Sequence, residues 1–111
     1  MPLPSPPNPA LADLAAVLGE DQAREVVRTF LKNFPPLLQE LRLGDRERGR
    51  RAAHSLKSSA RQMGALALAQ RMTALEERLA RPGAIIAVTD LADVARDFSA
   101  AAGPLRLFAG A

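Results

Sequence analysis

The twenty residues from Asp45 to Gly64 read DRERGRRAAHSLKSSARQMG, and their periodicity points to the fold class. At about 100° per residue, the small and apolar residues gather on one side of a helical wheel: Gly49, Ala52, Ala53, Leu56, Ala60 and Met63. Asp45 is a favourable N-cap, and Gly64 is a favourable C-terminal stop. The stretch therefore predicts one amphipathic helix that runs from the Asp45 cap to Met63 and turns its apolar side toward a core.

The segment before this helix has the same helical period. A short helix is expected over residues 10–18, where Gly19 stops it. A second helix begins at Asp21 and ends at Gly44, with a stripe of apolar residues along it: Val26, Val27, Phe30, Leu31, Phe34, Leu37, Leu38 and Leu41. The Pro35-Pro36 pair is expected to kink or break this helix, because proline lacks an amide hydrogen and clashes with the preceding turn.

Two further helices follow. One is expected over residues 65–79, with Leu68, Met72, Leu75 and Leu79 in line, and a turn follows at residues 81–83. Thr89 or Asp90 is expected to cap a fifth helix that continues through Phe98, with Gly103-Pro104 near its end. One short strand-like run, at residues 85–88, makes no sheet. The sequence therefore predicts an all-α fold, an antiparallel four-helix bundle with a short additional N-terminal helix.

Length and composition indicate a single domain. The chain has 111 residues, and five of the first nine are prolines, so we expect a Pro-rich flexible tail over residues 1–9 and one helical domain over residues 10–108. The absence of cysteine excludes disulfides and zinc–thiolate sites. We find neither the features of a signal peptide nor an apolar run near the roughly 20 residues of a membrane span. We therefore expect a cytoplasmic protein without a membrane partner.

His54 is the only histidine, and it falls on the polar side of the predicted helix. Its neighbours on the wheel are Glu47, Arg50, Arg51, Lys57, Ser58 and Arg61. The cations disfavour an imidazolium, so a neutral and nucleophilic imidazole is expected, and they attract an anionic group such as phosphoryl. A lone exposed histidine is nevertheless usually an ordinary surface residue. A metal site is not expected, because the chain offers no second histidine or cysteine.

Glu76 lies on the margin of the apolar stripe of the predicted fourth helix. A carboxylate in that position is expected to interact with a hydrogen-bonding or positively charged group, since burying an unpaired charge is costly. An imidazole on an adjacent helix is one such partner, and an arginine or solvent is another. If Glu76 accepts a hydrogen bond from the Nδ1–H of His54, the tautomer is fixed and Nε2 is free to attack.

The run from His54 to Ala60, followed by Gly64-Ala65, resembles the motif of histidine-containing phosphotransfer (HPt) domains. The usual form of that motif is H-x-L-K-G-S, then a stretch of small residues and an apolar residue before G-A. Leu56, Lys57, Ser59, Met63 and Gly64-Ala65 match it, whereas Ser58 stands where the family usually has glycine. Gly44-Asp45, the run Arg51-Ala52-Ala53 and Leu75-Glu76 fit the pattern as well.

The resemblance implies a four-helix bundle that carries a phosphoryl group on Nε2 of His54. It implies that Lys57 assists that group and that Glu76 holds the other ring nitrogen. We expect the docking surface to combine exposed residues around His54 with apolar residues of the first two helices, and the exposed residues are Arg50, Arg51, Ser58 and Arg61. The implied partners are a receiver domain of a response regulator and a histidine kinase, and the protein would be a monomer. The implied protein is a carrier rather than an enzyme and has no cofactor of its own, because the magnesium ion belongs to the receiver.

Two alternatives remain open from the residues alone. A basic helical domain could bind nucleic acid through arginines that contact phosphates: Arg46, Arg48, Arg50, Arg51 and Arg61. The net charge of +3 is weak support for this, and the acidic residues are spread along the chain. An adaptor that docks to receivers without phosphotransfer is the other alternative, and the presence of His54 and Lys57 argues against it.

Overall fold

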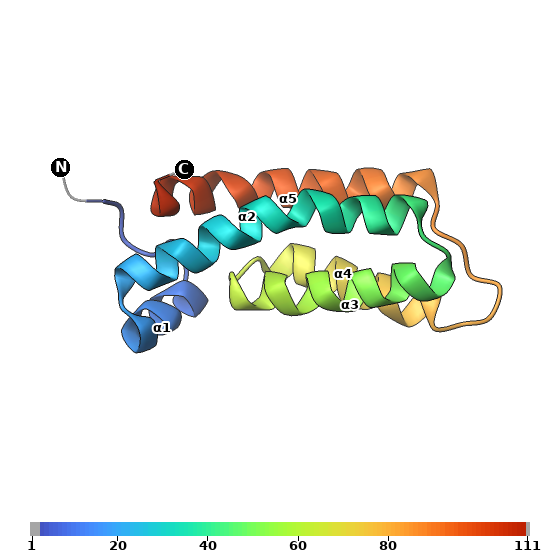
Figure 1. Cartoon of the computed structure of the whole chain (residues 1–111), viewed down its shortest axis with the longest axis horizontal. Coiled ribbons are helices and arrows are strands. Elements are labelled where there is room, and N and C mark those ends of the chain that lie inside the picture. The colour runs from blue at the N-terminus through green and yellow to red at the C-terminus, as the bar shows by residue number, and fades with distance from the viewer. Residues whose placement is uncertain (1–2, 111) are drawn as a thin grey trace.

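The structure, a computed structural model, describes residues 3–110, which form five helices and no strand. The helices are α1 (Pro9–Leu18), α2 (Glu20–Leu43), α3 (Arg46–Gln62), α4 (Leu66–Leu79) and α5 (Val88–Ala109). Helices α2 to α5 run alternately up and down, with α2 beside α5 and α3 beside α4, and α1 packs on one end of α2 (Figure 1). The predicted all-α bundle with a short N-terminal helix is confirmed.

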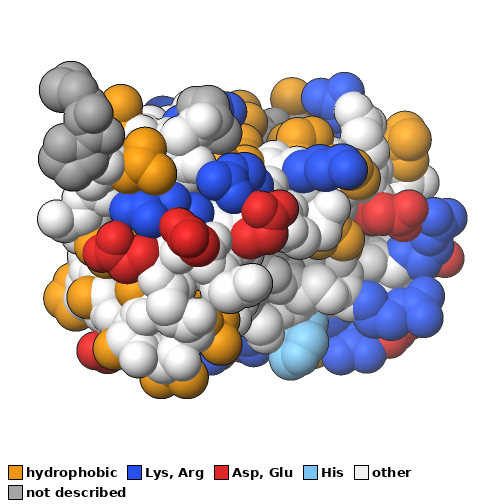
Figure 2. Space-filling view, turned by 60° about the vertical axis from the view of Figure 1, so that its left-hand side comes forward, with side chains coloured by type: hydrophobic (Ala, Val, Ile, Leu, Met, Phe, Trp, Pro, Cys, Tyr) orange, Lys and Arg blue, Asp and Glu red, His pale blue; other side chains and the backbone are white. Residues whose placement is uncertain are grey.

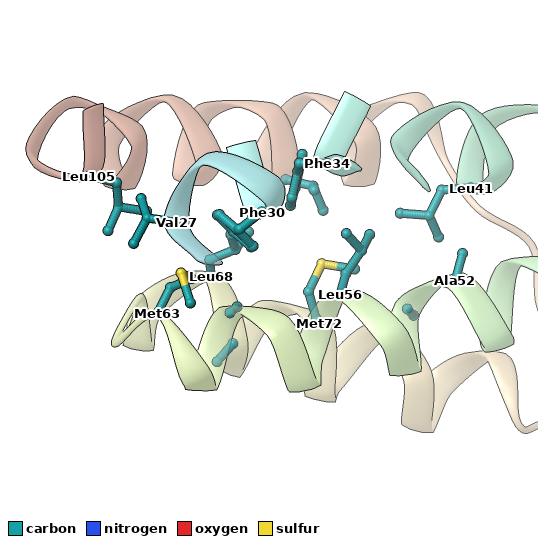
Figure 3. Close-up of a cluster of buried hydrophobic side chains, with 14 of the residues drawn as sticks. Val27, Phe30, Phe34, Leu41, Ala52, Leu56, Met63, Leu68, Met72 and Leu105 are labelled. Carbon is teal, nitrogen blue, oxygen red and sulfur yellow. The ribbon is translucent and has the colours of Figure 1, made fainter. Parts of the chain in front are cut away.

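The core is built mainly from aliphatic side chains at the predicted periodicity. Figure 3 shows the inner faces of the bundle meeting in one cluster, in which Leu56 of α3 and Met72 of α4 are almost completely buried. Phe34 of α2 stacks on Phe98 of α5 with a ring-centroid distance of 3.9 Å. Each fully buried Leu, Met or Phe contributes about 1.5–3 kcal/mol through the hydrophobic effect, so the stripes identified in the sequence hold the helices together.

The Pro35-Pro36 pair does not break α2, which runs without interruption from Glu20 to Leu43. Both prolines are exposed, so water can hydrogen-bond the backbone carbonyls that their missing amides leave free. The buried side chains of Phe34 and Leu41 anchor the helix on either side. The burial of these residues outweighs the local cost of the prolines.

The predicted ends of α3 agree closely with the structure. The Asp45 carboxylate accepts a hydrogen bond from the backbone N–H of Arg48 at 2.9 Å and caps the helix. The chain leaves the helix through Gly64, which has a φ of 71°, a value that L side chains rarely adopt. The side-chain amide of Asn8 donates to the carbonyl of Met63 at 2.9 Å, so the start of α1 is fixed to the end of α3.

Helix α5 begins earlier and ends later than the sequence indicates. The prediction of Thr89 or Asp90 as the N-cap was wrong, because the cap is Ala87 and the helix starts at Val88. Asp90 acts from inside the first turn, where its carboxylate accepts the backbone N–H of Ala87 at 2.8 Å. The helix continues through Gly103 and Pro104 to Ala109, because its last turn buries Phe108 and Ala109 in the core.

The predicted tail is tied to the bundle over part of its length. Its residues 1 and 2 lie outside the described residues, and Pro9 already belongs to α1, one residue before the predicted start. Arg24, which is buried, donates to the carbonyls of Pro4 and Phe108, each at 3.1 Å. This one guanidinium therefore links the N-terminal segment, α2 and the end of α5.

Candidate functional site

His54 lies in the middle of α3 and projects from the bundle, as the wheel predicts. Its side chain is 61% exposed, and Figure 2 shows the imidazole on the surface beside a group of Lys and Arg side chains. The buried residues of α3 include Leu56 and the small residues Ala53 and Ala60. Small side chains there let α4 approach closely, and this approach brings Glu76 of α4 within reach of His54.

The side chains of His54, Lys57 and Glu76 form one connected cluster. Oε1 of Glu76 is 2.9 Å from Nδ1 of His54, and Oε2 is 2.6 Å from Nζ of Lys57. Oε2 is buried, and within residues 3–110 the Lys57 ammonium is its only partner. Sequence reasoning anticipated the first contact as one of several outcomes, whereas the second follows only from the packing of α3 on α4.

The cluster fixes which ring nitrogen of His54 donates a hydrogen bond to Glu76. The ion pair and hydrogen bond with Lys57, followed by the hydrogen bond from His54, hold the pKa of Glu76 below its ordinary value, although partial burial opposes this effect. An ionised carboxylate only accepts hydrogen bonds, so Nδ1 of His54 must carry the proton that it donates. The lone pair of the neutral ring is then on Nε2, on the edge of the ring that faces away from Glu76.

The four predicted docking residues surround His54 but differ in whether they form ion pairs or side-chain hydrogen bonds within the protein. Arg50 forms an ion pair with Glu47, one turn before it on α3. Arg51, Ser58 and Arg61 are exposed and make neither a side-chain hydrogen bond nor an ion pair with residues 3–110. Because Lys57 is also paired, Arg51 and Arg61 are the cations near His54 that remain available to an anionic partner.

A groove follows the seam between α2 and α3, on the side of His54 that is away from α4. It has a volume of about 160 Å³ and is lined by Val26, Thr29, Phe30, Asn33, Phe34 and Leu37 of α2 and by Leu56, Ser59 and Gln62 of α3. Neither Ser59 nor Gln62 was assigned to the docking surface from the sequence, although their positions on the α2 side of the wheel could have indicated them. No lining residue comes from α1.

Metal and membrane sites are not evident in the part of the chain that the structure describes. Residues 3–110 contain no group of three or more His, Asp or Glu side chains placed to hold a metal ion. None of the five helices is long and apolar enough to cross a membrane.

Comparison with known proteins gives one match. The model of the Hpt domain family matches residues 25–103, a range that contains His54, Lys57 and Glu76 and extends into α5. No curated protein and no solved structure matches the chain.

Proposed function

The chain belongs to the Hpt domain family, and we propose that it carries a phosphoryl group on Nε2 of His54 between the proteins of a phosphorelay. Family membership supports a phosphotransfer role in two-component signalling, with kinases and receiver domains as the classes of partner. The observation that carries the assignment to His54 is the 2.9 Å hydrogen bond from its Nδ1 to Glu76, which places the lone pair of the neutral ring on Nε2 of an exposed side chain.

The proposed step is an in-line exchange between two acceptors. The Nε2 lone pair attacks the phosphorus of an aspartyl phosphate, the P–O bond breaks, and the aspartate leaves as a carboxylate with the electron pair. No proton has to leave Nε2, because the proton of the ring is already on Nδ1. The positive charge that develops on the ring lies against the ionised Glu76, which therefore stabilises the phosphorylated imidazole.

Lys57 supports the phosphoryl group through charge. Without Lys57, the carboxylate of Glu76 would repel the phosphoryl oxygens that arrive on the other side of the ring. The ammonium 2.6 Å from Oε2 offsets that negative charge and keeps Glu76 ionised. Glu76 can therefore orient His54 without opposing phosphorylation.

We infer that a receiver domain docks over the groove between α2 and α3. The groove is lined by apolar side chains such as Phe30 and Leu37 together with polar ones such as Ser59 and Gln62, a mixture that suits a transient protein interface. Arg51 and Arg61 make no ion pair with residues 3–110, and their charge complements the acidic pocket of a receiver. The magnesium ion would come from the receiver, and the protein would act as a monomer.

The nucleic-acid alternative draws no support from the arginines named for it. Arg48 is paired with Glu40 at 2.7 Å, Arg50 with Glu47, and Arg46 donates to the carbonyl of Leu79 at 2.8 Å. Among the contacts of residues 3–110, these partners leave two arginines of the set without an ion pair, Arg51 and Arg61, which is too few for a phosphate-binding surface.

The test is phosphotransfer with the His54→Gln variant. A phosphorylated receiver domain is mixed with the wild-type protein or the variant, and loss of label from the receiver is followed over time. The wild type is expected to remove the phosphoryl group from the receiver and to gain an acid-labile phosphoryl group itself, whereas the variant does neither. If the variant removes the phosphoryl group from the receiver as fast as the wild type does, His54 is not the acceptor. Absence of acid-labile label on the wild type with every receiver tested would favour the adaptor alternative.

A further inference from the structure

The surroundings of His54 differ between its two sides. On the wheel, Lys57 lies about 60° from His54 in one direction, and Ser58 lies about 40° from it in the other. Lys57 faces α4, where it lines a hollow with Thr73 and Glu76. Arg51 is on the same side of the wheel as Ser58 and lines a hollow that faces α2. Lys57 and Ser58 therefore flank the imidazole from opposite directions.

A phosphoryl group on His54 would lie on the side of Ser58. Nδ1 is bound to Oε1 of Glu76 at 2.9 Å, so Nε2 points away from α4. The Lys57 ammonium contacts the other oxygen of the same carboxylate and is largely buried, with a side-chain exposure of 16%. If Lys57 moved to the phosphoryl group, it would leave Oε2 buried without a partner, which is costly. A direct donor to the phosphoryl oxygens would therefore be a residue other than Lys57.

Ser58 has a free hydroxyl in the required position. It is exposed, one turn beyond His54, and its hydroxyl makes no hydrogen bond within residues 3–110. By contrast, Thr73 of α4 donates its hydroxyl to the carbonyl four residues back, Ala69, at 2.9 Å. Side chains of a helix lean toward its N-terminus, so the Ser58 side chain leans toward the turn that carries His54.

We propose that the Ser58 hydroxyl donates a hydrogen bond to the phosphoryl group on Nε2 of His54, and that it thereby stabilises the phosphorylated protein. This inference rests on the proposed function and deepens it, because it assigns the direct contact to Ser58 while Lys57 acts through Glu76. Ser58 then sets how readily the protein gives up its phosphoryl group, in addition to any effect of its size on docking.

The test separates binding of the phosphoryl group from docking. The equilibrium constant for phosphoryl exchange between the protein and a receiver domain does not depend on how fast the two proteins dock. Ser58→Ala is expected to shift this equilibrium toward the phosphorylated receiver by roughly threefold to tenfold, the net effect of one ordinary hydrogen bond at an exposed position. Ser58→Thr keeps a hydroxyl and is expected to stay near the wild-type value. Ser55→Ala removes an exposed hydroxyl next to His54 on the same helix and is expected to leave the equilibrium unchanged.

The proposal is overturned if Ser58→Ala changes only the rate of exchange and leaves the equilibrium unaltered. It is equally overturned if Ser55→Ala produces the same shift as Ser58→Ala. A second measurement needs no receiver: the protein is phosphorylated with a small phosphoramidate donor, and the ³¹P resonance of the phosphohistidine is recorded. Ser58→Ala is expected to move this resonance and Ser55→Ala to leave it in place, and identical spectra for wild type and Ser58→Ala would overturn the proposal. Failure of the wild type to exchange with any receiver would count against the proposed function, and the ³¹P comparison would still decide the role of Ser58.

Discussion

Replacing Glu76 with glutamine tests both the energetics and the chemistry of the cluster. The substitution keeps the size of the side chain and removes its charge, so Lys57 loses the carboxylate 2.6 Å from its ammonium. The two side chains are 16% and 19% exposed, so this pair lies between a surface ion pair, worth at most about 1 kcal/mol, and a buried one, whose disruption costs about 3–5 kcal/mol. We expect the free energy of unfolding to fall by about 2 kcal/mol.

For a domain of this size, that loss corresponds to a fall in Tm of roughly 10 °C. The effect on phosphotransfer has a different origin. A neutral amide neither requires the proton on Nδ1 nor offsets the positive charge of the phosphorylated ring, so we expect transfer to slow by on the order of tenfold to hundredfold. Urea denaturation at pH 7 measures the first effect. Single-turnover transfer from a phosphorylated receiver measures the second, and ¹⁵N spectra of the imidazole show which nitrogen carries the proton.

The matched control is Glu77→Gln, which removes the same charge from the next residue of α4. Glu77 is exposed and makes no ion pair within residues 3–110, so both stability and transfer should stay near the wild-type values. The reasoning is refuted if Glu76→Gln retains the wild-type transfer rate and the proton on Nδ1. It is also refuted if Glu77→Gln reproduces the losses of Glu76→Gln, because general charge would then be the cause.

Two further predictions concern backbone geometry and pH. Gly64→Ala should lower the free energy of unfolding by roughly 2–4 kcal/mol, because φ is 71° and a Cβ there would lie 2.2 Å from Oδ1 of Asn8. Gly83 has a φ of 81° but no atom within 4 Å of such a Cβ, so Gly83→Ala should lower it by only about 1 kcal/mol. Thermal unfolding compares the two variants, and equal losses would contradict a role for the Asn8 contact. The pKa of Glu76 is lowered in the folded protein, so its contribution to stability is complete above its ordinary value of 4.5 and is lost as the pH falls through the lower, folded-state value. The difference in unfolding free energy between wild type and Glu76→Gln, measured from pH 7 down to pH 3, should therefore shrink only below about pH 4.5, and a difference that disappears near pH 6 would contradict the assignment.

Helix positions were largely predictable because they depend on local chemistry. The Asp45 cap, the Gly64 stop and the 3.6-residue period give α3 its bounds, and all of them are visible within twenty residues. The errors occurred where distant packing overrides a local rule. Pro35-Pro36 stays within a helix because buried residues on both sides hold it, and α5 passes Gly103-Pro104 because Phe108 is buried beyond them.

The outward orientation of His54 and the match to the HPt motif come from the sequence by itself, since periodicity and residue order are one-dimensional properties. The partners of the cluster come only from the tertiary structure. Glu76 is 22 residues from His54, and the wheel leaves imidazole, arginine and solvent open as its partners. The close packing of α3 on α4 resolves this choice, because contacts between helices depend on three-dimensional distance. One oxygen of Glu76 contacts His54 and the other contacts Lys57, whereas the Ser58 hydroxyl has no hydrogen-bond partner within residues 3–110.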